Sequence, residues 1–338
     1  MQTILLTGGT GYIGSHGAVK LLELGYDVVI IDNLSNSDKS ILEKIQKITG
    51  KTPKFYEGDL RDKNILEKIF KENNIKTILH FAGAKAVGES CEIPFYYYEN
   101  NLAGSINLFE IMNKYNCKNI IFSSSATVYD SIGNPPYIET DLTGNTTNPY
   151  GTTKFLIENI LKDLATFKSF KVVNLRYFNP IGAHFSGLIG ENPNGLPNNL
   201  LPYVMKVATG ELKNVKVFGN DYNTKDGTGE RDYIHILDLI DGHIASINFI
   251  ENFDNNKGFF EVFNLGTGTA TSVLEIIKIT CEVTEKNIPF EIVPRRPGDL
   301  DKSFCNPEKA ENILNWKAKY LVKDAIKDSW YFIKNNSK

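Results

Sequence analysis

The stretch Thr3-Ile-Leu-Leu-Thr-Gly-Gly-Thr-Gly-Tyr-Ile-Gly14 decides the fold of this 338-residue chain. Its first five residues form an apolar run, long enough for a buried strand and too short for a helix. Glycines follow at Gly8, Gly11 and Gly14, and a helical pattern comes after them. Such a strand, turn and helix start can hold the pyrophosphate of a dinucleotide, because glycine permits close approach and the helix start presents N–H groups.

The next apolar run supports this prediction. Residues 26–31 form a second expected strand, and it ends in Asp32. A carboxylate there accepts hydrogen bonds from both ribose hydroxyls of NAD and repels the extra phosphate of NADP. No Lys or Arg follows before Lys39. The sequence therefore predicts an NAD site.

Short apolar runs alternate with amphipathic segments as far as residue 180. The expected strands are residues 3–7, 26–31, 54–57, 77–81, 119–123 and 171–178. The expected helices are residues 13–24, 41–48, 65–70, 101–112 and 149–167. This alternation predicts an α/β fold with a doubly wound parallel sheet of the Rossmann type, whose ligands bind beyond the C-terminal strand ends.

Beyond residue 180 the chain changes character. Residues 180–202 are rich in Gly, Pro and Asn, and residues 219–232 form another polar loop, with helices expected at 201–209 and 236–250. We predict an NAD-binding domain over residues 1–180 and a smaller substrate-binding lobe over residues 181–338. The apolar run 259–265 is a candidate to rejoin the sheet.

Composition excludes several classes of function. The 37 basic and 40 acidic residues give a net charge of −3, so neither nucleic acid nor an anionic membrane is an expected partner. The four cysteines and five histidines are dispersed without metal-ligand spacing, so we expect no metal site and no disulfide. No apolar stretch has the length of a membrane span, and the first strand begins at Thr3, which leaves no room for a signal peptide. We expect a cytoplasmic protein.

A tyrosine and a lysine carry the expected chemistry. Tyr150 and Lys154 share one face of a helix whose start is marked by Asn148 as N-cap and by Pro149. Because a free tyrosine has a pKa near ~10, the ammonium and a positive nicotinamide ring must lower that pKa for it to act as a base. Ser125, at the end of the preceding strand, can donate a hydrogen bond to the same oxygen. On its own the Y-x-x-x-K pattern also fits a Tyr–Lys pair on an exposed helix surface, but the predicted NAD site earlier in the chain favours a catalytic pair.

These motifs resemble those of the extended short-chain dehydrogenase/reductases. Five longer strings resemble, within that superfamily, the UDP-glucose 4-epimerase family, and the similarity runs from Thr3 to about Trp330. They are Phe-Ala-Gly-Ala-Lys-Ala-Val-Gly-Glu-Ser (81–90), Ser-Ser-Ser-Ala-Thr-Val-Tyr (123–129), Arg-Tyr-Phe-Asn-Pro (176–180), Pro-Asn-Asn-Leu (197–200) and Gly-Thr-Gly-Glu-Arg-Asp-Tyr-Ile-His (227–235).

The resemblance implies a tightly held NAD and a UDP-hexose, interconverted between UDP-glucose and UDP-galactose through a 4-keto intermediate. Its catalytic residues would be Tyr150, Ser125 and Lys154. The cofactor would contact these three and Gly8, Gly11, Tyr12, Ile13, Gly14, Asp32, Asn33, Asn36, Asp59, Leu60, Phe81, Ala82, Gly83, Lys85, Asn100, Tyr177 and Phe178. The substrate would contact Lys85, Ser125, Tyr150, Asn179, Asn199, Leu200, Phe218, Arg231, Tyr233, Arg296, Asp299 and Ser303.

Other members of the superfamily suggest alternatives. A 4,6-dehydratase has Asp-Glu after the serine that corresponds to Ser125, and a decarboxylase has Glu in the second of those places, whereas Ala126 and Thr127 stand here. A dehydrogenase would release NADH in bulk. An inactive NAD-sensing module would have lost Tyr150 or Lys154.

Two further expectations rest on the resemblance. Relatives with a tyrosine at the position of Ser303 act on UDP-glucose and UDP-galactose alone, while those with a small residue also accept N-acetylated sugars. Ser303 therefore suggests activity on UDP-N-acetylglucosamine and UDP-N-acetylgalactosamine. In relatives the helices at 101–112 and 149–167 form an intersubunit bundle, so we expect a homodimer.

Overall fold

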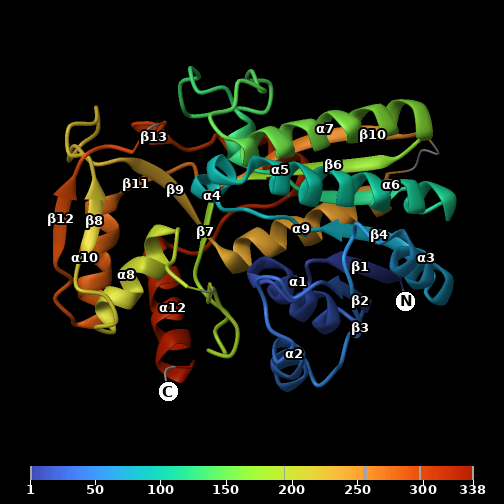
Figure 1. The fold of residues 1–338 in the computed structure, drawn as a ribbon, viewed down its shortest axis with the longest axis horizontal. Coiled ribbons are helices and arrows are strands. Elements are labelled where there is room, and N and C mark those ends of the chain that lie inside the picture. The colour runs from blue at the N-terminus through green and yellow to red at the C-terminus, as the bar shows by residue number, and fades with distance from the viewer. Residues whose placement is uncertain (1, 194, 254–256, 297, 337–338) are drawn as a thin grey trace. The chain divides into compact units, whose positions relative to one another are not determined.

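A computed structural model describes residues 2–193, 195–253, 257–296 and 298–336 of the chain. A seven-stranded sheet dominates it, in the order β10-β6-β5-β4-β1-β2-β3 (Figure 1). The six strands from β6 to β3 are parallel. The strands are β1 (Thr3–Thr7), β2 (Asp27–Asp32), β3 (Lys54–Glu57), β4 (Ile75–His80), β5 (Asn119–Ser123), β6 (Lys171–Tyr177) and β10 (Phe259–Leu265).

Helices cover both faces of this sheet. On one face α3 (Lys63–Glu72), α6 (Gly104–Lys114) and α7 (Pro149–Lys168) bury apolar side chains against the strands. On the other face α1 (Tyr12–Glu23) packs against α2 (Ile41–Thr49) and is joined to α9 (Ile236–Glu251) by the Lys20–Asp241 ion pair at 2.8 Å. The predicted doubly wound Rossmann-type fold is confirmed.

Two compact units make up the chain. The first comprises residues 1–130, 141–176 and 240–263, and the second residues 131–140, 177–239 and 264–338. The expected boundary at residue 180 therefore does not separate the two units completely, because most of α9 and of β10 belongs to the first unit. The apolar run 259–265 forms edge strand β10 beside β6.

The second unit contains smaller sheets. Strand β9 (Glu230–His235) pairs with β11 (Ala270–Ser272), β13 (Lys302–Ser303) and β7 (Asn179–Ile181), and β8 (Val215–Phe218) pairs with β12 (Phe290–Val293). Helices α8 (Leu200–Ala208), α10 (Val273–Thr284) and α12 (Val322–Asn336) pack beside them through two apolar clusters, and α11 (Glu308–Leu314) lies between β13 and α12 in the chain.

One expected helix differs in structure. The sequence predicts a helix over residues 101–112, but α6 begins at Gly104 and follows α4 (Val87–Glu92), α5 (Pro94–Tyr97) and a π-helical turn over Tyr98–Ala103. Side-chain hydrogen bonds from this turn explain the difference, as described below.

None of the helices within the described ranges combines the length and the apolar character required to cross a bilayer. Among these same residues, no group of three or more His, Cys, Asp and Glu side chains could hold a metal ion.

Candidate active site

The glycine turn between β1 and α1 has no room for side chains. Gly8 has φ +69°, and a Cβ there would lie 2.9 Å from the backbone of Ala82. A Cβ on Gly14 would overlap the Gly8 carbonyl oxygen and lie 2.7 Å from Gly9 Cα. No side chain caps α1 at Gly11, so the helix start presents backbone to any group bound there. Tyr12 and Ile13 form the first turn of α1 and are half-buried.

Asp32 ties the end of β2 to this turn. Its carboxylate accepts hydrogen bonds from the backbone N–H of Thr10 at 3.1 Å, from that of Leu34 at 2.9 Å and from Ser37 Oγ at 3.2 Å. Asn33 and Asn36 lie exposed in the following turn. The carboxylate is thus held at the C-terminal edge of the sheet, beside the glycines.

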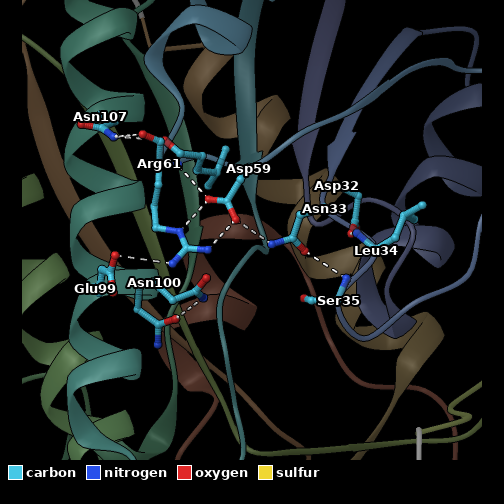
Figure 2. Close-up of polar contacts among 11 residues, drawn as sticks. Asp32, Asn33, Leu34, Ser35, Asp59, Arg61, Glu99, Asn100 and Asn107 are labelled. Atoms are coloured by element: carbon cyan, nitrogen blue, oxygen red, sulfur yellow. Dashed lines mark hydrogen bonds and ion pairs between the residues drawn. The ribbon is translucent and has the colours of Figure 1, made fainter.

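A second carboxylate follows β3. Arg61 donates to Asp59 through Nε at 2.9 Å and Nη2 at 2.9 Å, and Asn33 Nδ2 donates to it at 2.9 Å (Figure 2). These hydrogen bonds, led by those of Arg61, hold the pKa of Asp59 well below its usual range. Asn107 donates to the backbone carbonyls of Leu60 and Arg61, which fixes the Asp59–Leu60 turn to α6.

The predicted catalytic helix starts as expected. Asn148 caps α7 by accepting the Gly151 N–H at 2.9 Å, and Pro149 occupies the first turn, which confirms the predicted start. Tyr150 and Lys154 on this helix are buried, and so is Ser125 beyond the end of β5. Lys154 Nζ lies 5.8 Å from the centre of the Tyr150 ring.

The pKa of Tyr150 depends on its burial and on its hydrogen-bond partners. In the protein alone, burial raises that pKa, and the hydrogen bond from Ser125 lowers it only in part. The predicted lowering also depends on the positive nicotinamide ring, so it stays a prediction for the NAD-bound protein. Lys154 donates to the Ser123 carbonyl at 2.7 Å, and burial lowers its own pKa to about 8 against the opposing effect of Glu158.

Sequence reasoning missed Asn101 in the π-helical turn. Its side chain is buried, accepts the Ala84 N–H at 2.8 Å, and donates to the Ala84 carbonyl at 3.1 Å and to Thr153 Oγ1 at 3.0 Å. It therefore ties the turn after β4 to α7, next to Tyr150. Asn100, the residue the sequence did single out, donates to Asn101 Oδ1 at 3.1 Å. The remaining predicted residues of that turn are Phe81, Ala82, Gly83 and Lys85, of which Gly83 and Lys85 are exposed.

A buried ion pair was also missed. Arg176 on β6 and Glu158 on α7 meet at 2.6 Å, and Ser124 donates to the same carboxylate at 2.5 Å. Glu158 lies one helical turn beyond Lys154 and supports the charge on that ammonium. No short motif could have revealed this pair, since its members come from distant segments.

In the second unit, strand β9 gathers the predicted substrate residues. Tyr233 on β9 is in register with Asn179 on β7, and Arg231 with Ser303 on β13. Between them, the buried Asp232 accepts hydrogen bonds from the Thr267 N–H and hydroxyl and from the Gly268 N–H. Tyr233 is buried too, which raises its pKa to about 12.

Two arginines share one carboxylate in this unit. Arg296 Nε donates to Asp299 at 2.8 Å, and Arg231 Nη2 lies 3.5 Å from the other oxygen of that carboxylate. The Arg296 guanidinium also lies 4.7 Å from the centre of the Phe218 ring. Two guanidinium groups for one carboxylate leave a local positive charge suited to a diphosphate.

The other predicted residues of this unit lie at the edges of its elements. Asn199 is exposed at the start of α8 and donates to Glu191 at 2.8 Å, and Leu200 is the first residue of α8. Tyr177 and Phe178 lie at the end of β6, before β7, and Phe178 is buried.

Known proteins resemble the chain over nearly its whole length. A sequence model of the family described as GDP-mannose 4,6 dehydratase matches residues 5–329. The UDP-glucose 4-epimerase of Bacillus subtilis is 51% identical, over 99% of this chain and 98% of that protein. The crystal structure of UDP-glucose 4-epimerase from Bifidobacterium longum in complex with NAD+ and UDP is 50% identical, with a TM-score of 0.94 over 99% of both chains. The structure of the UDP-Glc/GlcNAc 4-epimerase from Campylobacter jejuni is 32% identical, with a TM-score of 0.85 over 99% of this chain and 100% of that one.

The doubly wound sheet, the glycine turn and the Tyr–Lys pair define an extended short-chain dehydrogenase/reductase. Within that class the identity of about one half to full-length relatives is decisive. The chain belongs to the UDP-glucose 4-epimerase family.

Proposed function

We propose that the protein interconverts UDP-glucose and UDP-galactose with a tightly bound NAD. The observation that carries the proposal is the buried constellation of Tyr150, Ser125 and Lys154 at the C-terminal edge of a sheet that also presents an uncapped glycine turn. The B. longum relative, crystallised with NAD+ and UDP, supports both ligands.

The residues present fit NAD. The backbone at Gly8, Gly11 and Gly14 would receive the pyrophosphate, because side chains at Gly8 and Gly14 would collide with neighbouring backbone and none caps the helix at Gly11. Asp32 and Asp59 at the strand ends would receive the adenosine half. When bound, NAD would supply the reversible oxidation of the sugar at C4, which is needed because the hydrogen on that carbon is not acidic.

Side chains of the protein would transfer the proton of the sugar's 4-hydroxyl group. Tyr150 would accept that proton and return it, and Ser125 would hold the phenol oxygen in place by its hydrogen bond. Lys154 is anchored to the Ser123 carbonyl, so its ammonium stays near the Tyr150 ring. Burial of all three side chains excludes water from this proton transfer.

The residues beside Ser125 argue against a dehydratase. Thr127 donates its hydroxyl to Ser125 Oγ at 3.0 Å, in a 3-10 turn over Ala126–Val128. An elimination needs a further acid and base beside the tyrosine, and neither Ala126 nor Thr127 can supply a carboxyl group.

The test is direct. Denaturation of the purified protein should release NAD that was never added, and the native protein should interconvert UDP-glucose and UDP-galactose. A protein that requires added NAD and accumulates NADH in proportion to product would instead be a dehydrogenase.

The specificity of the enzyme extends, in our proposal, to N-acetylated UDP-sugars. Ser303 is in register with Arg231 on the sheet that carries the predicted substrate residues, and its short side chain leaves space where a tyrosine would not. The C. jejuni relative is named as acting on both sugar types. Wild type should epimerise UDP-N-acetylglucosamine, and Ser303→Tyr should lose this activity while keeping most of its rate on UDP-glucose. No reaction of wild type with the acetamido sugar would end the idea.

We also assign the protein to galactose metabolism in the cytoplasm, acting as a homodimer. Exposed apolar side chains on α5 and α6, namely Phe95, Tyr96 and Ile106, support a contact between copies at these helices. Sedimentation at micromolar protein should show a dimer, and a monomer would refute this part of the proposal.

A further inference from the structure

The side chain of Tyr222 in the second unit carries a buried hydroxyl. Tyr222 lies in the loop between β8 and β9, and its side chain is only 5% exposed. Within the described part of the chain, its Oη makes no hydrogen bond. An unpaired buried hydroxyl is costly, so it calls for an explanation.

The ring that carries this hydroxyl is held rigidly. The Arg295 guanidinium lies 3.9 Å from the ring centre, and Asp221 holds that guanidinium through Nε at 2.7 Å. Gly219 also packs closely against the ring: its φ is +80°, and a Cβ there would lie 2.7 Å from Tyr222 Cε2. The Tyr222 N–H donates to the Gly227 carbonyl at 3.0 Å. Stacking, close packing and a backbone bond therefore hold the phenol in one place.

The Tyr222 ring lies beside the proposed diphosphate site, because Gly219 packs against it and the ring of the preceding Phe218 lies 4.7 Å from the Arg296 guanidinium. Burial and the Asp299 carboxylate raise the pKa of Tyr222, and the guanidinium groups of Arg295, Arg231 and Arg296 lower it. Guanidinium groups only donate hydrogen bonds, and Asp299 already accepts from Arg231 and Arg296. Tyr222 Oη makes no hydrogen bond to any of these neighbours.

We propose that Tyr222 is a further substrate-binding residue, whose hydroxyl donates a hydrogen bond to a phosphate oxygen of the UDP-sugar. A diphosphate carries many acceptor oxygens and would complete a donor set that already contains Arg231 and Arg296. The inference rests on the proposed function, because it names a residue for the same ligand. The stack of the Tyr222 ring on the Arg295 guanidinium would hold the hydroxyl in position for this hydrogen bond.

The proposal makes an unusual prediction for stability. Tyr222→Phe keeps the ring and its stack on Arg295, and it deletes only an unsatisfied hydroxyl. The ligand-free variant should unfold at the same temperature as wild type or above it, while its affinity for the ligand falls.

The test is calorimetric titration of the holoprotein with UDP, UMP and uridine. Tyr222→Phe should weaken UDP binding about tenfold or more, the size expected for a hydrogen bond to a charged acceptor, and leave uridine binding unchanged. UMP should show the full loss if the bond is to the α-phosphate and little loss if it is to the β-phosphate. In turnover, KM for UDP-glucose should rise by a similar factor with kcat nearly unchanged.

The control is Tyr203→Phe, which removes a hydroxyl from α8 in the same unit and should bind UDP like wild type. UDP affinity of Tyr222→Phe within twofold of wild type would overturn the inference, and so would an equal loss for uridine. If wild type does not bind UDP at all, both the proposed function and the role of Tyr222 are refuted. If wild type binds UDP and Tyr222→Phe binds it equally well, only the role of Tyr222 is refuted.

Discussion

Replacing Lys154 by methionine tests two effects of the buried ammonium: its cost to the stability of the fold and its contribution to turnover. Methionine matches the length of the apolar stem but carries no ammonium. In wild type that ammonium donates to the Ser123 carbonyl at 2.7 Å and lies 4.8 Å from the centre of the Phe122 ring. Lys154→Met should cripple turnover, because the proton transfer at Tyr150 loses its supporting charge.

The effect on stability follows from the pKa of Lys154. Burial lowers it from its ordinary 10.5 to about 8, so between these two pH values the unfolded chain binds more protons than the folded one. The stability of wild type therefore rises with pH across this window, by about 3 kcal/mol in all. Below pH 8 the folded protein bears the full free-energy cost of burying the charged Lys154 side chain. Above pH 10.5 this cost has disappeared, because the side chain is neutral in both the folded and the unfolded chain.

Methionine removes this penalty but leaves the Ser123 carbonyl without its donor, at a cost of about 1–3 kcal/mol. At pH 7 the variant should thus equal wild type or exceed its stability by about 2 kcal/mol. Near pH 10.5 it should be less stable by about 1–3 kcal/mol.

The measurement is the thermal midpoint of both proteins at pH 7 and near pH 10.5. Other titrating groups cancel in the difference between wild type and variant. Lys162→Met, at an exposed position on the same helix, is the control and should show no such reversal. A Lys154→Met difference that stays constant with pH would refute the reasoning.

Three further predictions concern the same unit. Tyr150→Phe should retain NAD and lose about 10²–10⁴-fold in turnover, and activity within a few-fold of wild type would remove the tyrosine from its role. Gly14→Ala should yield protein without co-purified NAD, because its Cβ overlaps the preceding turn, whereas Gly88→Ala, with open space around its Cβ, should keep it. Glu158→Gln should destabilise the fold by about 3–5 kcal/mol in urea unfolding, since Arg176 would stay buried without its partner; a cost below about 1 kcal/mol would contradict this.

Features that depend only on neighbouring residues in the sequence were predictable. The strand from Thr3 to Thr7, the uncapped glycine turn and the start of α7 at Asn148 all depend on neighbours a few residues away. Helical spacing likewise places Tyr150 and Lys154 on one face. The resemblance to a known family extended these motifs to the predicted site residues of the second unit.

Other features depend on distant segments and left no pattern in the chain. Asn101 lies in a π-helical turn because its side chain bonds Ala84 and Thr153, and no periodicity indicates that choice. The same holds for the Arg176–Glu158 pair and for the Arg295 guanidinium over the Tyr222 ring.

The sequence by itself therefore determined the alternation of strands and helices up to about residue 180 and the glycine turn between β1 and α1, and it singled out the residues proposed for proton transfer. Only the tertiary structure decided the direction in which the pKa values of Tyr150 and Lys154 shift in the protein alone. Burial raises the pKa of Tyr150 and lowers that of Lys154. The physical reason is that spacing sets which groups are near one another, whereas desolvation depends on every segment packed around them.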